Sequence, residues 1–334
     1  WYNYASSVTS ILVRSSVTGI GGSAFYGCSN ITDITLPFVG VSRTATGPEA
    51  TFGYIFGYSA SIETCSTSSS YSSITMYSSA SRSSGFSQSY QVGTSATYNS
   101  TAFINGLSDY SSSDWNKPWY TCRDGKYRER ENFSYYYGQI QTYTFDVPTV
   151  LKTVTITDAS KIETAAFNNC KNITKIVLND GITSIGDYAF QNSGIEDFAI
   201  PDSVSTIGKY FCYGCTGLTE MSIPNAVTII PSYAFYGCRY ISKLALSRNT
   251  SSIGDYAFYN CSGVSKLVIP DKTETIGDHA FEGCSKVKAI HIPDSVSSIR
   301  SYAFNGCTSA TALSIGSGIK ALPTYAFGNC TGLN

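Results

Sequence analysis

A cysteine recurs every 23 residues through the second half of the chain, and this fixed interval limits the folds that are possible. A phenylalanine lies three residues before most of these cysteines, and an aliphatic residue lies five residues before that phenylalanine. A period in the twenties with several apolar columns is typical of a solenoid, in which each coil contacts only its neighbours. The columns are Cys215, Cys238, Cys261, Cys284, Cys307 and Cys330; Phe235, Phe258, Phe281, Phe304 and Phe327; and Ile230, Ile253, Ile276, Ile299 and Leu322.

One coil illustrates the local structure that we expect. Alternating apolar residues predict a short strand over Val264–Ile269, and Pro270 ends it because proline has no N–H to donate. Gly277 permits a tight bend, and Asp278 caps a one-turn helix that carries the Ala-Phe pair. From residue 151 onward we expect one continuous parallel sheet, with the phenylalanines and cysteines buried. The same pattern predicts strands at Val8–Val13, Ile31–Leu36, Leu151–Ile156, Ile173–Leu178, Ile195–Ile200, Leu218–Ile223, Ile241–Leu246, Val264–Ile269, Val287–Ile292 and Ala310–Ile315.

These residues resemble the BspA-type leucine-rich repeat family, whose unit reads close to L-x-x-I-x-I-P-x-x-V-x-x-I-G-x-x-A-F-x-x-C. The resemblance covers residues 8–37 and 151–334. It implies a leucine-rich repeat solenoid of the α/β class, with short parallel strands and short helical or 3-10 turns. It also implies secreted or surface-exposed proteins that bind host proteins or other cells, and it brings no catalytic residue. We therefore divide the chain into N-terminal repeats (1–37), an insertion (38–150) and a C-terminal repeat array (151–334).

One coil departs from the repeat in a way that predicts its packing. Cys212 lies in the phenylalanine column, so Cys212-Tyr-Gly-Cys215 is a structural pair rather than a redox motif. Cysteine is much smaller than phenylalanine, so we expect Phe211 and Tyr210 to fill the space.

The insertion has a composition of its own. It contains 13 of the 26 tyrosines and two of the three tryptophans, among serine-rich stretches such as 66–73 and 78–84. Three interpretations stay open: a flexible linker, a structural subdomain that buries its aromatic residues, and a binding surface. Tyrosine and serine together are typical of antibody binding loops, which favours binding. The candidate binding residues are Trp115, Trp119, Tyr135, Tyr136 and Tyr137, on β-rich structure.

The eleven cysteines suggest a disulfide framework at first sight. In a stacked column, however, equivalent side chains point the same way, and a bridge would twist both coils. We expect reduced, buried thiols that pack as small apolar groups. Cys65 and Cys122 lie outside the column, and a bridge between them remains open.

No pattern in the sequence indicates catalysis or a cofactor. His279 and His291, the only histidines, are expected at the surface and lack the carboxylate pattern of a zinc site. Nucleophile-elbow and phosphate-loop motifs do not occur. The exposed strand positions carry small residues, with Lys175, Lys243 and Lys266 as the remaining candidates for contact.

Composition narrows the function further. Charged residues make up 13% of the chain and the net charge is −1, which argues against nucleic-acid binding. No apolar run is long enough to span a membrane. We expect a segment of a longer exported protein, outside the cell or on its surface. The predicted function is non-enzymatic adhesion through a host extracellular or other cell-surface protein, and the alternatives are glycan binding by the insertion aromatics or a passive spacer.

Overall fold

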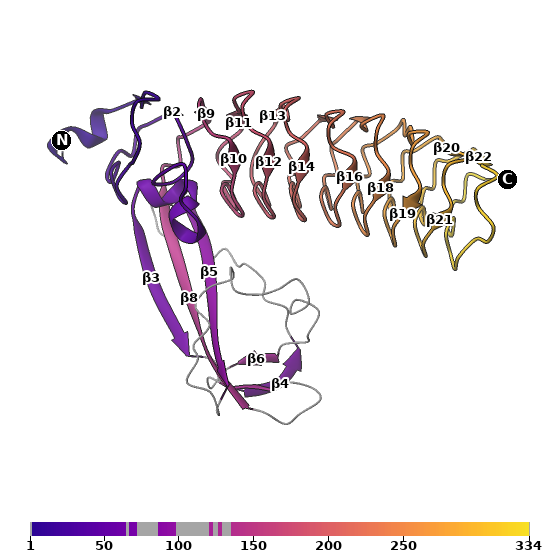
Figure 1. The fold of residues 1–334 in the computed structure, drawn as a ribbon, viewed down its shortest axis with the longest axis horizontal. Coiled ribbons are helices and arrows are strands. Elements are labelled where there is room, and N and C mark those ends of the chain that lie inside the picture. Colours follow the sequence, from indigo (N-terminus) through magenta and orange to yellow (C-terminus); the bar gives the residue numbers. More distant parts are fainter. Residues whose placement is uncertain are drawn as a thin grey trace.

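The computed structural model is a rod of stacked coils from which a β-sheet projects near the N-terminal end (Figure 1). It describes residues 2–64, 67–71, 86–97, 120–122, 126–128 and 135–333. Each coil contributes apolar side chains to one core that runs along the rod, from Ala5 to Cys330. A 3-10 helix, η1 (Tyr2–Ser7), precedes the first coil.

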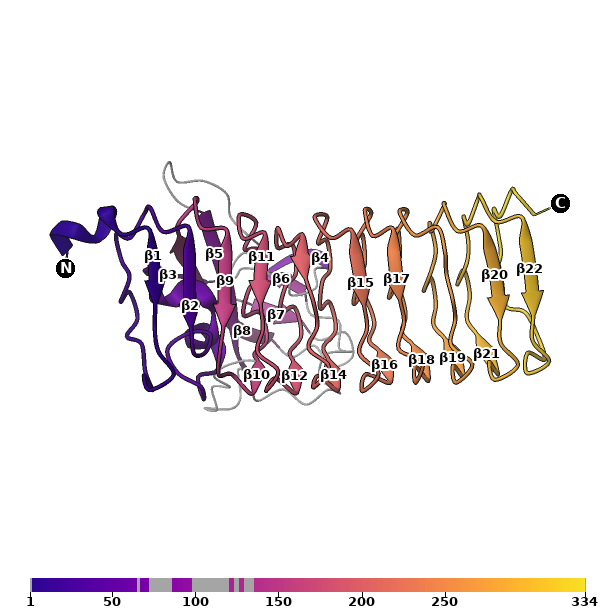
Figure 2. The same cartoon turned by 90° about the horizontal axis from the view of Figure 1, so that it is seen from above.

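Short parallel strands line one face of the rod, side by side along its length (Figure 2). Their ladder has two breaks, so the prediction of one continuous sheet is wrong. The first lies where the coil spacing changes, from 22 residues between Lys175 and Asp197 to 23 between Glu220 and Lys243. The second is the coil of Val264–Ile269, which has no strand although Val264, Leu267 and Ile269 are buried. Inward packing therefore holds this coil in place. The strands are β1 (Ser10–Leu12), β2 (Asp33–Leu36), β9 (Thr153–Ile156), β11 (Lys175–Val177) and β13 (Asp197–Phe198); then β15 (Glu220–Ser222) with β17 (Lys243–Ala245); then β20 (Ala289–Ile292) with β22 (Ala312–Ile315).

A second row of two-residue strands runs along the rod at the aliphatic column. Ile230, Ile253, Ile276 and Ile299 are buried there, whereas Leu322 in the last coil is 52% exposed. These strands are β10 (Lys161–Ile162), β12 (Ser184–Ile185) and β14 (Thr206–Ile207), then β16 (Ile229–Ile230), β18 (Ser252–Ile253), β19 (Thr275–Ile276) and β21 (Ser298–Ile299).

A glycine follows the aliphatic residue of the column in most coils, and the reason is not the tight bend expected from the sequence. Gly277 does not have a positive φ. A Cβ atom there would lie 2.5 Å from the backbone nitrogen of Asp255, in the preceding coil. The column therefore needs glycine because neighbouring coils approach closely.

The Ala-Phe segment forms turns and not the expected one-turn helix. Tyr256 and Asn260 have φ values of 57° and 55°, in the left-handed region that non-glycine residues rarely adopt. This backbone directs alternate N–H groups along the rod. Tyr256 donates to Asp278, Phe258 to Ala280 and Asn260 to Glu282 in the next coil, at 2.7–2.8 Å.

The recurrent aspartates join coils instead of capping helices. The Oδ1 atom of Asp255 accepts a hydrogen bond from the backbone nitrogen of Asp278, at 2.9 Å. Asp278 in turn accepts one from Ser301, at 3.0 Å. The prediction of a helix cap is therefore wrong, because each carboxylate satisfies the backbone of the following coil.

The phenylalanine column is the centre of the core. Phe235, Phe258, Phe281 and Phe304 have no exposed surface, and neighbouring rings stack with centroids 5.2–5.3 Å apart. This confirms the predicted register of the repeat.

The coil that carries Cys212 repacks around the smaller side chain. Phe211 is fully buried and makes edge contacts with Phe190 and Phe235, at 5.5 and 5.6 Å. Phe198 adds a second ring, 4.7 Å from Phe190. Phe211 thus fills the space as predicted, whereas Tyr210 stacks on Tyr188 and Tyr233 instead.

The stack continues directly across the insertion, because β2 pairs with β9 in parallel register, Asp33 opposite Thr153. Residues 38–57 complete the coil of β2, and they include η2 (Gly47–Ala50) and η3 (Phe52–Ile55). The nitrogen of Phe25 donates to Ile55, and that of Phe52 donates to Ala166. The rings of Phe52 and Phe167 lie 5.2 Å apart. Residues 38–57 thus belong to the core of the rod.

The projecting sheet begins at Tyr58 and ends at Val147. Its strands are antiparallel in the order β3 (Tyr58–Thr64), β8 (Tyr135–Val147) and β5 (Phe86–Thr97), with β7 (Lys126–Arg128) also beside β8. A separate pair consists of β4 (Thr67–Tyr71) and β6 (Tyr120–Cys122). The strands of this sheet reach 12 and 13 residues, much longer than those of the rod.

Candidate functional site

The predicted binding residues belong to the projecting sheet or its connections. Trp115 and Trp119 lie outside the described residues. Tyr135, Tyr136 and Tyr137 open β8, where Tyr136 is opposite Tyr127 of β7 and Thr97 of β5. Tyr136 and Tyr137 are therefore paired on both edges, whereas Tyr135 is paired only with Arg128 of β7. Their role in binding stays a prediction.

The root of the sheet is fixed to the rod by buried aromatic residues. Phe145, near the end of β8, is fully buried, and its ring lies 6.0 Å from that of Tyr54. Val147 is also fully buried. The base of the sheet thus packs against residues of the rod.

A ladder of stacked rings follows the Ala-Phe turns, and the sequence analysis did not single it out. Neighbouring rings of this long ladder are nearly parallel, with centroids 4.5–5.2 Å apart. Each residue has a positive φ between 52° and 61°. Seven side chains form the long ladder: Tyr188, Tyr210, Tyr233, Tyr256, His279, Tyr302 and Tyr325.

A short ladder lies against the long one. Tyr213, Tyr236 and Tyr259 stack with centroids 4.6 Å apart. Each of them touches a ring of the long ladder at 5.6–6.0 Å with a tilt of 35–52°. The two ladders together make a continuous aromatic strip along one edge of the rod.

The sequence does contain the signal for the long ladder. A tyrosine precedes the Ala-Phe pair in most coils, with His279 in one of them. This column can be read as part of a helical turn, and only the left-handed backbone brings its rings into a stack. Burial raises the pKa of Tyr233 to about 12, with further contributions from the neighbouring Tyr210, Tyr256 and Asp255.

The exposed face of the strand row offers little for contact, as predicted. Ala245, Ser222 and Ala312 are exposed there, and Val268 is 59% exposed. Lys243 forms an ion pair with Glu220 of the neighbouring strand. Surface pairs of this kind contribute little to stability.

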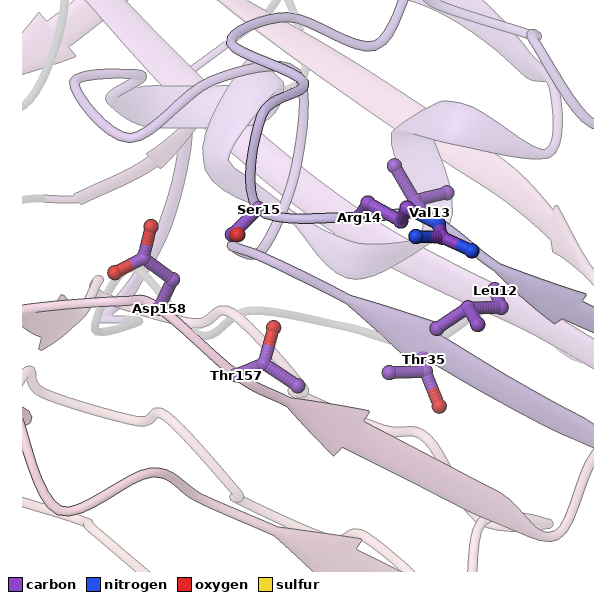
Figure 3. A pocket seen from close by; sticks show the side chains of 7 residues that line it. All are labelled: Leu12, Val13, Arg14, Ser15, Thr35, Thr157 and Asp158. Atoms are coloured by element: carbon purple, nitrogen blue, oxygen red, sulfur yellow. The ribbon is translucent and has the colours of Figure 1, made fainter.

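A shallow hollow of roughly 480 Å³ lies where β1, β2 and β9 end (Figure 3). Asp158 is the acidic residue that lines this hollow, and its carboxylate forms an ion pair with Arg43. Arg43 also donates hydrogen bonds to the carbonyl oxygens of Ser15 and Val17. An acidic group neutralised in this way is poorly placed to act as a general base. The lining residues are Leu12, Val13, Arg14, Ser15, Thr35, Thr157 and Asp158.

The cysteine column is buried and reduced, as predicted for its described members. From Cys215 onward, each thiol of the column donates to the carbonyl oxygen of the Phe-column residue of an earlier coil, as from Cys261 to Phe235 at 3.1 Å. Burial raises the pKa of the Cys284 thiol to about 12. Cys65 lies outside the described residues, so whether it is bridged to Cys122, at the end of β6, stays open.

The two histidines differ in their surroundings. His291 is exposed on β20, where its Nδ1 atom lies 2.6 Å from the Ser314 hydroxyl. His279 is half-buried between Tyr256 and Tyr302, and its Nδ1 atom pairs with Glu282. Within the described part of the chain, no cluster of histidine, cysteine or acidic residues could hold a metal ion. The described residues also include no helix of sufficient length and hydrophobicity to cross a membrane.

The repeat, the stacked coils and the buried columns together define a leucine-rich repeat solenoid. The chain belongs to the BspA type leucine rich repeat region family, whose model matches six copies over residues 1–105, 138–265 and 251–334. Solenoids of this family are typically non-enzymatic. A comparison with curated proteins gave no match.

Solved structures of bacterial leucine-rich repeat proteins are similar to the chain. A leucine rich cell surface protein from Faecalibacterium prausnitzii is 19% identical, with 98% of this chain and 78% of that chain covered and a TM-score of 0.41. The pneumococcal vaccine antigen PcpA is 22% identical, with 57% of each chain covered and a TM-score of 0.40. The leucine rich repeat protein of T. pallidum is 17% identical, with 55% and 78% covered and a TM-score of 0.29.

Proposed function

We propose that the chain is a non-enzymatic adhesion module that acts outside the cell or on its surface and binds another protein through the projecting sheet. The observation that carries this proposal is the sheet itself, with strands of up to 13 residues that extend away from the rod. Packing of Phe145 and Val147 at its base favours a defined position of the sheet, which would reduce the entropy lost when a partner binds. The strand face of the rod has few of the side chains that dominate protein interfaces.

The insertion aromatics are the proposed contact residues. Tyrosine and tryptophan supply large, rigid, amphipathic contact area, and serine supplies adaptable hydrogen bonds. Trp115, Trp119, Tyr135, Tyr136 and Tyr137 are the side chains that we propose for this role. The division into repeats (1–37), insertion (38–150) and array (151–334) remains a proposal of the sequence pattern.

A binding screen with and without the insertion tests this function. Ala60 and Tyr143 are opposite one another in the β3–β8 register, so a short Gly-Ser turn can join them in place of residues 61–142. Both proteins are screened against an array of host extracellular proteins and an array of glycans. The proposal expects protein ligands that bind the full chain and not the shortened one. Binding to glycans alone would identify a carbohydrate-binding protein, and equal binding by both proteins would place the contact surface on the rod.

A further inference from the structure

The aromatic strip on the Ala-Phe turns is a second surface with a chemistry of its own. In the long ladder, Tyr188, Tyr210, Tyr233 and Tyr256 form an unbroken run of phenols with spacings of 4.6, 4.7 and 4.8 Å. The phenol oxygens accept or donate no hydrogen bond with any described group, and none of them is a buried atom without a partner. These hydroxyls therefore have no partner among the described groups, although the residues that carry them are half-buried.

Stacking determines what this row can recognise. Each internal ring has both faces covered by its neighbours, so it cannot stack on a sugar ring or a nucleobase. What remains available is the ring edge and a phenol hydroxyl, which can donate one hydrogen bond and can also accept. The ordinary pKa of a phenol is about 10, and burial raises it further here, so these hydroxyls are protonated at neutral pH. A suitable partner has free acceptors that recur at an interval matching the spacing of the row.

A proline-rich chain has these properties. In the polyproline II conformation its carbonyl groups form no internal hydrogen bonds, and proline has no N–H. Carbonyl groups three residues apart point the same way at intervals of about 9.3 Å. Two steps of the ladder, at 4.7 and 4.8 Å, span nearly the same length. Aromatic surfaces also bind such segments at low entropic cost, because the segment is already extended.

We propose that the long ladder binds a proline-rich peptide segment in the polyproline II conformation. Alternate phenols of the run donate to successive carbonyl groups on one side of the peptide, and proline rings pack on the apolar ring edges. An added β-strand fits less well, because its groups on one side recur at roughly 6.4–6.8 Å, which matches neither one nor two steps of the ladder. The ladder residues are not part of the projecting sheet, and a single hydroxyl can be removed without altering the sheet, so the two binding proposals can fail independently.

His279 limits the length of the site. It has no hydroxyl, and its Nδ1 atom is engaged by Glu282. The hydroxyl row resumes at Tyr302. A tyrosine at position 279 would join the two parts of the row and provide one further donor.

The test measures the affinity of the full chain for a synthetic peptide of about ten prolines, by isothermal titration calorimetry. Tyr233→Phe removes one hydroxyl and keeps the stacked ring, so we expect binding to weaken roughly 2- to 10-fold, the range for one lost hydrogen bond. His279→Tyr should tighten binding. Tyr256→Phe gives a second variant should the first not fold. Tyr240→Phe is the matched control, because Tyr240 is 65% exposed and belongs to neither ladder; its affinity should not change.

Three results would overturn this proposal. One is the absence of heat on titration to millimolar peptide. Another is equal affinity for a Gly-Ser peptide of the same length, which would show that extended backbone alone suffices. The third is unchanged affinity in both phenylalanine variants of the ladder. Protein capture by the projecting sheet plays no part in any of these measurements.

Discussion

Single residues in this molecule act through the columns to which they belong. Phe258 lies between Phe235 and Phe281 at centroid distances of 5.2 and 5.3 Å, with almost parallel rings. Its loss would leave two neighbouring coils without their shared contact. In a solenoid such a defect is not relieved elsewhere, because each coil contacts only its neighbours.

Phe258→Ala should therefore lower the free energy of unfolding by about 3–5 kcal/mol, as for other buried phenylalanines. Phe327→Ala is the matched comparison, since Phe327 is only partly buried in the last coil, and it should cost less. Chemical denaturation monitored by circular dichroism gives both values. Equal costs for the two variants would contradict the ladder as the source of stability.

The reactivity of the column thiols provides a measurement of how well the same core is buried. Cys238, Cys261 and Cys284 have no exposed surface, and burial raises the pKa of each thiol. A protonated, inaccessible thiol reacts slowly, so a thiol reagent should label these residues only after denaturation. Among the described thiols of the column, Cys330, which is 8% exposed, should be labelled first. Rapid labelling of the native internal column, counted by mass spectrometry, would disprove this arrangement.

Tyr233 predicts a loss of stability at high pH. Its pKa is about 12 in the folded chain and about 10 when unfolded. Because the folded state holds the phenol proton more tightly, protonated Tyr233 contributes to the free energy of unfolding, and this contribution is complete below about pH 10. This contribution is lost as the pH rises from about 10 to 12. The difference in ultraviolet absorbance between the native protein and the Tyr233→Phe variant should titrate late, and the same difference in guanidinium should titrate near pH 10. Coincident titrations would show that the ring is not held in the stack.

At the scale of the element, coil spacing is set by backbone contacts as much as by side chains. The Cβ atom of an alanine at position 277 would meet the backbone nitrogen of Asp255 at 2.5 Å. Gly277→Ala should therefore destabilise the protein by about 1–3 kcal/mol, the usual cost of overpacking. Gly21→Ala is the control, because no atom lies within 4 Å of the added group. Thermal unfolding of both variants checks this, and a neutral Gly277→Ala would mean that the coils are farther apart.

The elements also show which features of the fold could be predicted from the sequence. The burial of the columns that contain Phe258, Cys261 and Ile253 could be predicted, because the 23-residue period alone places equivalent residues in equivalent positions. The period does not determine the backbone between them. An Asp-Tyr-Ala-Phe segment is compatible with a helical turn, and the left-handed conformation of Tyr256 becomes evident only with the bonds to the next coil. For this reason the long ladder was not predicted. The insertion has no repeat, so the sequence does not indicate which of its side chains are buried.

At the scale of the whole molecule, the rod is one stack that the insertion does not interrupt. Strand β2 pairs directly with β9, and residues 38–57 complete the intervening coil. Solenoids accept such insertions because a loop can leave the stack and return to the same coil. The chain can thus carry a projecting sheet without altering the register of the coils on either side.

Unfolding of the shortened protein, in which a Gly-Ser turn replaces residues 61–142, tests this continuity most directly. If the stack is continuous, the shortened protein folds, keeps its native circular dichroism, and unfolds with a midpoint close to that of the full chain. Amide protons in β2 and β9 should stay protected from hydrogen exchange to the same extent in both proteins. Loss of protection in β2 and β9 on removal of the sheet would contradict the account, because the insertion would then be holding the two parts of the rod together.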